Sequence, residues 1–497
     1  MSLARSAAGA TAARDESQAL RDEAEGFRDE AQAASALTTP VDTPLYSHAF
    51  DGEDGSIAGG FVKGSGLWSV GATSTEVLNA FPTKGYFTRR EYDPVSYESA
   101  IHLTIWNGQS LQERHRNGAN HTTEQEYGVF AFEAQAAAPT AYYPAIATSI
   151  GVTGTSEYGA PYAKGESPMF GMSYQGELAE KLDGIRIDQI GLKHIIVNNG
   201  VGSTSLAAHA QGGASGTYAL MQGQVAGAKT IAANEGWPLV ARAVMWNQGE
   251  SGSGTDYTYA GYKAALQNLA VSYDSAIRAI TGGADPVYLI TGQTNSAGPH
   301  STSDRFGVAR AQLHAAIDHA NVLFSTPQYF FEYGPGDELG LHLTAHGAKW
   351  RGAYDALVYQ RVIIEGGTWE PLRFVFDSRV GNFVYLRAVG AEGPLAIDTN
   401  TLPPQANHGF TATTAALAAV NVVGVTLAGT DLIRVQLANY AAGHRIQYAM
   451  NVATGMGYYT GGAGNIRDSL GDRLPMFEGN GIDRKMHKWA AAHEIIV

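Results

Sequence analysis

Between residues 99 and 366 the chain alternates between short apolar runs and longer stretches of helical character, and this alternation limits the folds open to it. The predicted strands are 100–106, 192–198, 239–246, 287–292 and 322–326. Helices are predicted near 173–182, 217–233, 257–281, 307–320 and 347–364. Strands that alternate with helices form a parallel sheet with helices on both faces. We therefore predict an α/β fold whose functional residues lie at the carboxyl ends of the strands.

The first forty residues have a different pattern. The sequence Arg-Asp-Glu begins at Arg14, Arg21 and Arg28, so it recurs every seven residues. Apolar residues, mostly alanine, lie at alternating spacings of three and four between positions 10 and 34, which is the seam of a coiled coil. An alanine seam buries little apolar area per turn. We predict a short coiled-coil stalk over 1–40 that joins copies of the chain.

Composition divides the rest of the chain into three further domains. Residues 41–98 are rich in Gly, Ser, Thr and aromatic residues, which predicts a small β-rich collar. The α/β domain follows over 99–366. From 367 the alternation stops, and short β runs separated by Gly, Asn and Pro predict an antiparallel β-sandwich over 367–497, ending in a loop-rich tail.

Bulk properties exclude several classes of function. The net charge of −14 argues against general binding to nucleic acid, whose phosphates are repelled. The absence of cysteine excludes disulfides, thiolate metal sites and cysteine nucleophiles. No apolar run approaches the roughly 20 residues that span a bilayer, and no apolar leader is visible at the N-terminus. We expect no membrane insertion, and synthesis in the cytoplasm without export by the general secretory route.

Polar blocks follow the predicted strands. Gly108-Gln109-Ser110 follows the first strand, "NNGVGSTS" (198–205) the second and "WNQGES" (246–251) the third. A further block, "GDELGLHLTAHGAKWRG" (336–352), precedes the last helix. Because the carboxyl ends of parallel strands meet at one edge of a sheet, we expect these blocks to converge.

The residue types in these blocks suit acyl transfer. Ser110 can supply a hydroxyl nucleophile, and His342 or His346 can take its proton and return it to the leaving alcohol. An acidic residue is needed to orient the histidine, and Glu250 is a candidate.

A negative charge that develops on the carbonyl oxygen needs hydrogen-bond donors. The glycine turn offers a backbone N–H at Gly202, and the third block offers a side-chain amide at Gln248 or Asn247. Losing one such donor costs about 3 kcal/mol of transition-state stabilisation.

The four blocks resemble those of the SGNH-hydrolase superfamily, in particular its sialate O-acetylesterase and acetylxylan-esterase branch. The "QGES" block is the most specific of them. The resemblance implies a flavodoxin-like three-layer αβα domain and a serine carbohydrate esterase without metal or other cofactor. It implies that Ser110 is the nucleophile and His342 the base, and that Gly202, Gln248 and the Ser110 backbone N–H form the oxyanion hole. It leaves His346 a structural role.

The sequence departs from this family at one position. The family commonly has Asp three residues before the histidine, where this chain has Leu339. Asp337 and Glu338 lie five and four residues before His342. We predict that Glu250 orients the histidine, with Glu338 or Asp337 as the alternative acid.

The order of the domains gives a second resemblance, to bacteriophage tail-fibre and tailspike proteins. It implies a homotrimer on a virion tail, or encoded by a prophage, whose N-terminus binds other tail proteins. Such proteins leave the host by lysis and act outside the cell. The implied partner is an O-acetylated surface polysaccharide of a bacterium.

Two other functions compete with an esterase. One is a fibre that binds the host glycan but has lost useful activity, which the leucine at position 339 favours. The other is a glycan-cleaving enzyme with two facing carboxylates, drawn from Asp337, Glu338 and Glu250. The second leaves the serine and histidine blocks unexplained.

Overall fold

The structure is a computed structural model that divides into two compact units, 1–91 and 92–497. It describes residues 40–41, 46–51, 57–62, 68–70, 100–110, 122, 127–132, 137–145, 153–155, 161–163, 167–183, 193–250, 258–295, 306–334, 342–450, 462–479 and 482–497. The predicted coiled-coil seam, between positions 10 and 34, lies outside these residues.

The first unit contains a small antiparallel sheet. Its four strands, in order along the sheet, are β1 (Pro40–Val41), β2 (Tyr46–Asp51), β3 (Ile57–Val62) and β4 (Trp68–Val70). The short β segments expected between residues 41 and 98 are therefore present in the first part of that range.

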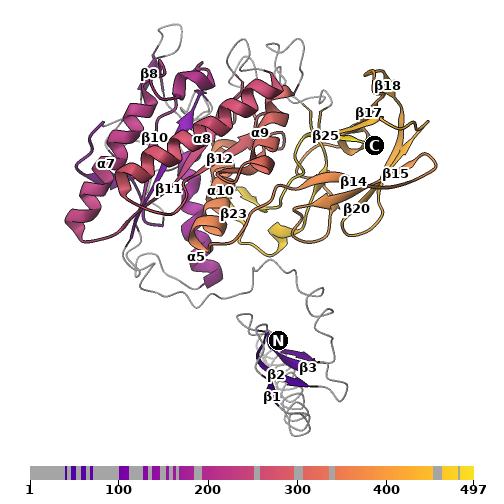
Figure 1. The fold of residues 1–497 in the computed structure, drawn as a ribbon, viewed down its shortest axis with the longest axis horizontal. Helices are drawn as coiled ribbons and strands as arrows, with labels where there is room; N and C mark the ends of the chain where they lie inside the picture. The colour runs from indigo at the N-terminus through magenta and orange to yellow at the C-terminus, as the bar shows by residue number, and fades with distance from the viewer. Residues whose placement is uncertain are drawn as a thin grey trace, which may run out of the picture. The chain divides into compact units, whose positions relative to one another are not determined.

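The second unit is built around a seven-stranded sheet (Figure 1). Its strands, in spatial order, are β13 (Val322–Pro327), β12 (Tyr288–Gln293), β11 (Leu239–Asn247), β5 (Ile101–Gly108), β10 (Lys193–Asn198), β6 (Val129–Phe132) and β7 (Tyr142–Pro144). All neighbours are parallel except β6 and β7. The first strand of the domain, β5, lies between β10 and β11, so the chain reverses its direction of winding there. A ligand site is expected at such a switch point.

The helices of this unit lie close to the ranges predicted from the sequence. They are α5 (Ser173–Asp183), α7 (Thr217–Glu235), α8 (Tyr259–Thr281), α9 (Gly307–Asp318) and α10 (Ala345–Tyr359), which continues as a π-helical turn, Gln360–Ile364. Local signals set their ends: Thr258 and Thr344 cap α8 and α10 through side-chain oxygens, and Gly282 ends α8 in a left-handed conformation.

Alternate residues of β5 point to opposite faces of the sheet, and each face is covered. Ile101, Leu103 and Ile105 belong to a core cluster with apolar residues of α7, α8 and α9. On the other face, Nδ1 of His102 lies 2.7 Å from the hydroxyl of Tyr359 in α10. The class is therefore α/β with a mainly parallel central sheet, as predicted.

Two antiparallel four-stranded sheets follow. The first contains β14 (Arg373–Val380), β15 (Phe383–Val389), β20 (Leu432–Leu437) and β19 (Val422–Leu427). The second contains β18 (Ala419–Val420), β17 (Phe410–Thr413), β21 (Arg445–Tyr448) and β25 (His493–Ile496). Phe374 of β14 contacts the rings of Phe410 and Tyr448, so the two sheets share an aromatic cluster.

Smaller pairs complete this region: β16 (Ala396–Ile397) with β22 (Ile466–Arg467), and β23 (Phe477–Gly479) with β24 (Ile482–Arg484). In the C-terminal tail, predicted to be rich in loops, residues 462–465 and 485–492 are irregular apart from an isolated bridge at Trp489. Residues 489–492 are buried, and the chain then forms β25. One tryptophan and three alanines present little polar side chain to water, which favours this burial.

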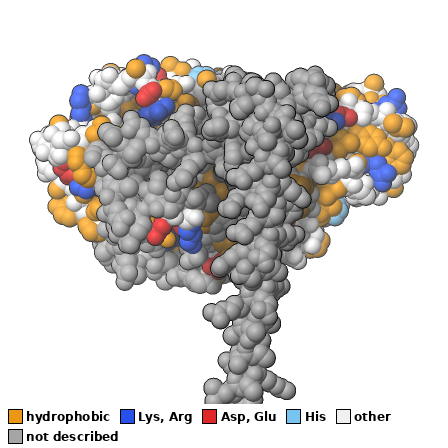
Figure 2. All heavy atoms as spheres, turned by 90° about the horizontal axis from the view of Figure 1, so that it is seen from below, with side chains coloured by type: hydrophobic (Ala, Val, Ile, Leu, Met, Phe, Trp, Pro, Cys, Tyr) orange, Lys and Arg blue, Asp and Glu red, His pale blue; other side chains and the backbone are white. Residues whose placement is uncertain are grey.

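The C-terminal sheets expose part of their apolar surface. Val375, Phe376 and Val380 of the edge strand β14 are 38%, 42% and 65% exposed. In the view from below, hydrophobic side chains lie among Lys and Arg at this end of the molecule (Figure 2). Among the described residues, no helix combines the length and the apolar character needed to cross a bilayer.

Candidate active site

The predicted blocks begin at adjacent strand ends. β5, β10 and β11 are neighbours in the sheet and parallel, so the residues that follow them emerge at the same edge. Ser110 follows β5, Gly202 follows β10, and Gln248 and Glu250 follow β11.

Gly108 explains how the serine is presented. Its φ is +140°, and a Cβ added there would lie 2.1 Å from the carbonyl oxygen of Asn247. Only a residue without a side chain allows β5 to turn this close to β11. The Gln109 N–H then donates to the same Asn247 carbonyl over 2.9 Å, and Ser110 follows at the sheet edge.

Ser110 and His342 are in direct contact. Nε2 of the histidine lies 2.8 Å from Oγ of the serine, although the two residues are 232 positions apart. The His342 ring is buried and the serine half-buried. This is the distance at which an imidazole can take the proton of a nucleophilic hydroxyl.

The backbone around His342 is fixed by a short antiparallel bridge. Tyr333 and Leu343 form the bridge, and the Gly334 N–H donates to the His342 carbonyl over 2.9 Å. Two residues after the histidine, Thr344 begins α10 as its N-cap. The histidine is therefore held between a strand-like contact and a helix start.

Glu250 is buried beside this pair, but its hydrogen bonds to described residues run elsewhere. One carboxylate oxygen accepts from Gln109 Nε2 and the other from the Thr294 hydroxyl, each over 2.5 Å. Burial raises the pKa of Glu250, while the Thr294 hydrogen bond and the charges of His342 and Arg351 act to lower it. The carboxylate thus holds Gln109, the residue before Ser110, and interacts with the histidine through its charge. The alternative acids, Asp337 and Glu338, lie outside the described residues.

The candidate oxyanion donors lie around the turn after β10. Gln248 Nε2 donates to the Thr204 carbonyl over 3.1 Å, and its Oε1 accepts from the Tyr262 hydroxyl over 2.8 Å. These bonds fix the plane of the amide beside the turn that contains Gly202. The alternative donor, Asn247 Nδ2, is buried and has no hydrogen-bond partner among the described residues.

Two residues outside the predicted set, His209 and Asn107, connect these parts. Nε2 of His209 lies 2.8 Å from the Thr204 hydroxyl, and its Nδ1 lies 3.1 Å from Oδ1 of Asn107. Asn107 directly precedes the Gly-Gln-Ser block, and its position near the end of a strand is the local signal by which the sequence could have identified it.

His346 lies away from Ser110, in the first turn of α10. Its Nδ1 lies 3.3 Å from Glu332 Oε2, and its Nε2 lies 3.2 Å from the Ile482 carbonyl. Its described contacts are thus with the framework. The described residues contain no group of three or more His, Asp or Glu side chains placed to hold a metal ion. The arrangement as a whole can generate a serine nucleophile, transfer its proton and stabilise an anion next to it.

Comparisons with known proteins gave structural similarities only. No family model and no curated protein sequence matches the chain. A carbohydrate acetylesterase from Xanthomonas citri is 15% identical with a TM-score of 0.47, over 79% of this chain and 80% of the other. A protein from Arabidopsis thaliana is 15% identical with a TM-score of 0.35, over 52% and 97%. An active-site mutant of a family two carbohydrate esterase from Clostridium thermocellum is 11% identical with a TM-score of 0.25, over 53% and 64%. The interpretation of the site therefore rests on its own geometry.

Proposed function

We propose that the protein is a serine esterase that removes O-acetyl groups from a bacterial surface polysaccharide. The observation that carries the proposal is the 2.8 Å contact between Ser110 Oγ and His342 Nε2 at the carboxyl edge of a parallel sheet. A serine hydroxyl becomes a useful nucleophile at neutral pH when a positioned base takes its proton.

The reaction then proceeds in two halves. Ser110 Oγ attacks the acetyl carbon while His342 takes the hydroxyl proton, and the carbonyl π electrons move onto oxygen. When the tetrahedral intermediate collapses, the bond to the sugar oxygen breaks and His342 returns its proton to that oxygen. Water, deprotonated by His342, then attacks the acetyl-serine, the bond between Ser110 Oγ and the acetyl carbon breaks, and His342 returns the proton to Oγ, which releases acetic acid as acetate and a proton.

The oxyanion of both intermediates needs donors that are in place beforehand. We assign this role to the backbone N–H groups of Ser110 and Gly202 and to the Gln248 amide. The hydrogen bonds of Gln248 to Thr204 and Tyr262 support the assignment because they set the amide beside the turn. Glu250 is assigned the acidic role, since its buried charge stabilises the imidazolium that forms on His342.

We propose that the enzyme acts on a virion tail as a homotrimer. It is made in the bacterial cytoplasm, or from a prophage, and reaches the outside by lysis. The seven-residue repeat of Arg-Asp-Glu between Arg14 and Glu30 supports a stalk that joins copies and binds other tail proteins. The β-rich C-terminal region is proposed as an accessory domain.

The test is acetate release from an O-acetylated bacterial polysaccharide and from an aryl acetate. Wild type should release acetate, and Ser110→Ala should not. Ser378→Ala, in the exposed part of β14, is the matched control and should retain wild-type rates. Folded wild-type protein that binds the polysaccharide but releases acetate from neither substrate would instead identify a receptor-binding fibre without activity, the function that Leu339 favours.

A further inference from the structure

The segment that bears His342 rests on Glu332. The Thr344 N–H donates to the Glu332 carbonyl over 2.8 Å, next to the bridge between Tyr333 and Leu343. A Cβ added at Gly347 would lie 2.6 Å from the same carbonyl, so the first turn of α10 also packs against this residue. A shift of Glu332 therefore moves the backbone that directly follows His342.

The Glu332 side chain is held from two directions. His346, in α10, lies 3.3 Å from Oε2, and Arg484 Nη2 donates to Oε1 over 2.5 Å. The two contacts hold the pKa of Glu332 at about 2, with the histidine contributing most, so the carboxylate is charged at neutral pH. The Arg484 guanidinium also lies 5.5 Å from the centre of the Trp350 ring.

Arg484 belongs to the C-terminal region, on the hairpin β23–β24. The hairpin packs on α10 through Phe477, whose ring centre lies 5.9 Å from that of His346. The segments before and after the hairpin are joined by two contacts. Lys485 pairs with Asp472 over 2.5 Å, and His487 Nδ1 accepts from the Gly471 N–H over 3.1 Å.

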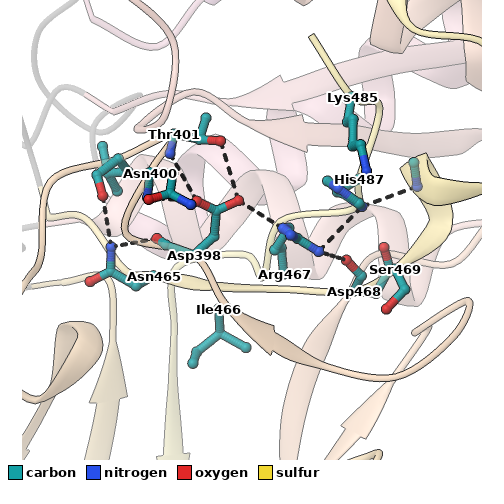
Figure 3. A network of polar contacts seen from close by, with 12 residues as sticks. Asp398, Asn400, Thr401, Asn465, Ile466, Arg467, Asp468, Ser469, Lys485 and His487 are labelled. Carbon is teal, nitrogen blue, oxygen red and sulfur yellow. Dashed lines mark hydrogen bonds and ion pairs between the residues drawn. The ribbon is translucent and has the colours of Figure 1, made fainter.

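His487 also contacts Arg467, over 3.5 Å, and Arg467 belongs to a wider polar network (Figure 3). Arg467 donates to Asp398 over 2.8 Å and to the backbone carbonyl of Asp468 over 2.8 Å. The Lys488 N–H donates to Asp468 Oδ1 over 2.9 Å. The hairpin that carries Arg484 is thus fixed in the C-terminal region at several points.

A second set of contacts links the C-terminal region to Glu250. Gln293, the last residue of β12, exchanges two hydrogen bonds of 2.8 Å with the backbone of Ala492. The next residue, Thr294, donates its hydroxyl to Glu250. The C-terminal region therefore contacts the supports of both the histidine and the acid.

We propose that Arg484 is a positioning residue for His342, and that the C-terminal region is part of the catalytic machinery of the α/β domain. Arg484 holds Glu332, and Glu332 holds the backbone on which His342 is aligned with Ser110. This inference rests on the function proposed above, since it assigns a role within the same site.

The test compares Arg484→Gln with Arg445→Gln. Arg445 is a matched control because its side chain is also 33% exposed and makes an ion pair within the same region, 2.8 Å from Glu494. Two quantities are measured: kcat and KM for an aryl acetate, and the rate at which a fluorophosphonate labels Ser110. We expect Arg484→Gln to lower kcat and the labelling rate by about tenfold with KM nearly unchanged, since small misalignments reduce rate more than binding.

Two further variants strengthen the test. Arg484→Lys should recover much of the loss, because it restores the charge. Glu332→Gln should lose as much as Arg484→Gln, and the double variant should lose no more than either, since the two residues act as one unit. Near-UV circular dichroism shows whether each variant is folded.

The outcomes separate this inference from the proposed function. Labelled wild type that hydrolyses no ester would refute the esterase and leave the role of Arg484 standing, provided that Arg484→Gln labels more slowly. Equal labelling of Arg484→Gln and Arg445→Gln would overturn the role of Arg484. An unfolded Arg484→Gln alongside a Glu332→Gln as reactive as wild type would overturn it as well. Wild type that the probe does not label would refute both.

Discussion

Nδ1 of His209 lies 3.1 Å from Oδ1 of Asn107. Through this contact His209 joins the end of β5 to the turn that contains Gly202. Nδ1 also lies 3.0 Å from the Thr217 hydroxyl, and Nε2 lies 2.8 Å from Oγ1 of Thr204, which donates to the Val201 carbonyl over 2.6 Å. Burial lowers the pKa of His209 to about 4, so the ring is neutral at pH 7. One neutral ring therefore sets the distance between Ser110 and the proposed oxyanion donors.

Replacing this ring should reduce catalysis more than binding. In His209→Phe the contacts of the ring nitrogens with Asn107, Thr204 and Thr217 are lost, and the turn with Gly202 is free to move away from Ser110. We expect kcat for an aryl acetate to fall by about tenfold or more, as for the partial loss of an oxyanion donor, with KM little changed. His319→Phe is the control, since His319 precedes β13 and so lies at the opposite edge of the sheet. A fall in kcat that is equal in both variants would contradict the prediction.

A methyl group at position 108 should disrupt the sheet edge. Gly108→Ala places a Cβ 2.1 Å from a backbone oxygen and also forces a φ of +140°. Gly212→Ala separates the two effects, because Gly212 has a φ of +74° and nothing within 4 Å. We expect Gly212→Ala to cost about 1 kcal/mol of unfolding free energy and Gly108→Ala to cost several times more. Urea unfolding of the two variants measures this difference, and equal values would rule out the clash.

Neutralising Glu250 should slow the reaction strongly. Glu250→Gln removes the buried charge that stabilises a protonated His342 and disturbs the acceptors of Gln109 and Thr294. We expect kcat to fall by about 100-fold or more, by analogy with the orienting acid of other serine hydrolases. The control is Glu370→Gln, whose carboxylate pairs with Arg373 at the surface.

Variants of Asp337 and Glu338 show which result would contradict this prediction. If Asp337→Asn or Glu338→Gln lowers kcat more than Glu250→Gln does, the acid that orients His342 is Asp337 or Glu338 and not Glu250. The kcat values of the three variants, measured on one substrate, decide between these assignments.

Mild acid should destabilise the fold through its buried histidines. Burial lowers the pKa of His493 from 6.5 to about 4, and its ring accepts from the Phe374 N–H over 2.9 Å. His493 therefore becomes protonated below about pH 6.5 in the unfolded chain, but only below about pH 4 in the folded chain. The contribution of His493 is complete above pH 6.5 and is lost as the pH falls, by about 3 kcal/mol in all.

Other buried histidines act in the same direction. Burial also lowers the pKa of His102, His209 and His487 to about 4. Urea unfolding at pH 7.5 and pH 5 should show a marked fall in the unfolding free energy, and His493→Gln should reduce that fall. An unfolding free energy that is the same at both pH values would contradict the prediction.

Much of the α/β domain was predictable because its signals are local. The predicted helix 257–281 corresponds to α8, Tyr259–Thr281, and Thr258 and Gly282 mark its ends. The predicted strand 192–198 corresponds to β10, Lys193–Asn198. The meeting of the serine and histidine blocks followed from the rule that parallel strands end at one edge.

The contacts between the C-terminal region and the residues around the site were not predictable in this way. Arg484 contacts Glu332 across 152 positions, and Gln293 contacts Ala492 across 199. Neither pair leaves a periodic pattern or a motif, because each depends on how the C-terminal region docks. The role of Glu250 in orienting His342 stays a prediction; its described hydrogen bonds run to Gln109 and Thr294.

The position of β5 in the sheet has a consequence for synthesis of the protein. This strand is made first in its domain, yet its two neighbours, β10 and β11, come from much later in the chain. One edge of β5 can pair once Asn198 has emerged, but the edge that faces β11 stays unpaired until Asn247 has emerged, and the hydrogen bond from Gln109 to Asn247 cannot form earlier. Pairings between such distant segments fold slowly and expose strand edges meanwhile. Translation rate and chaperone capacity should therefore control the yield of active protein in a recombinant host.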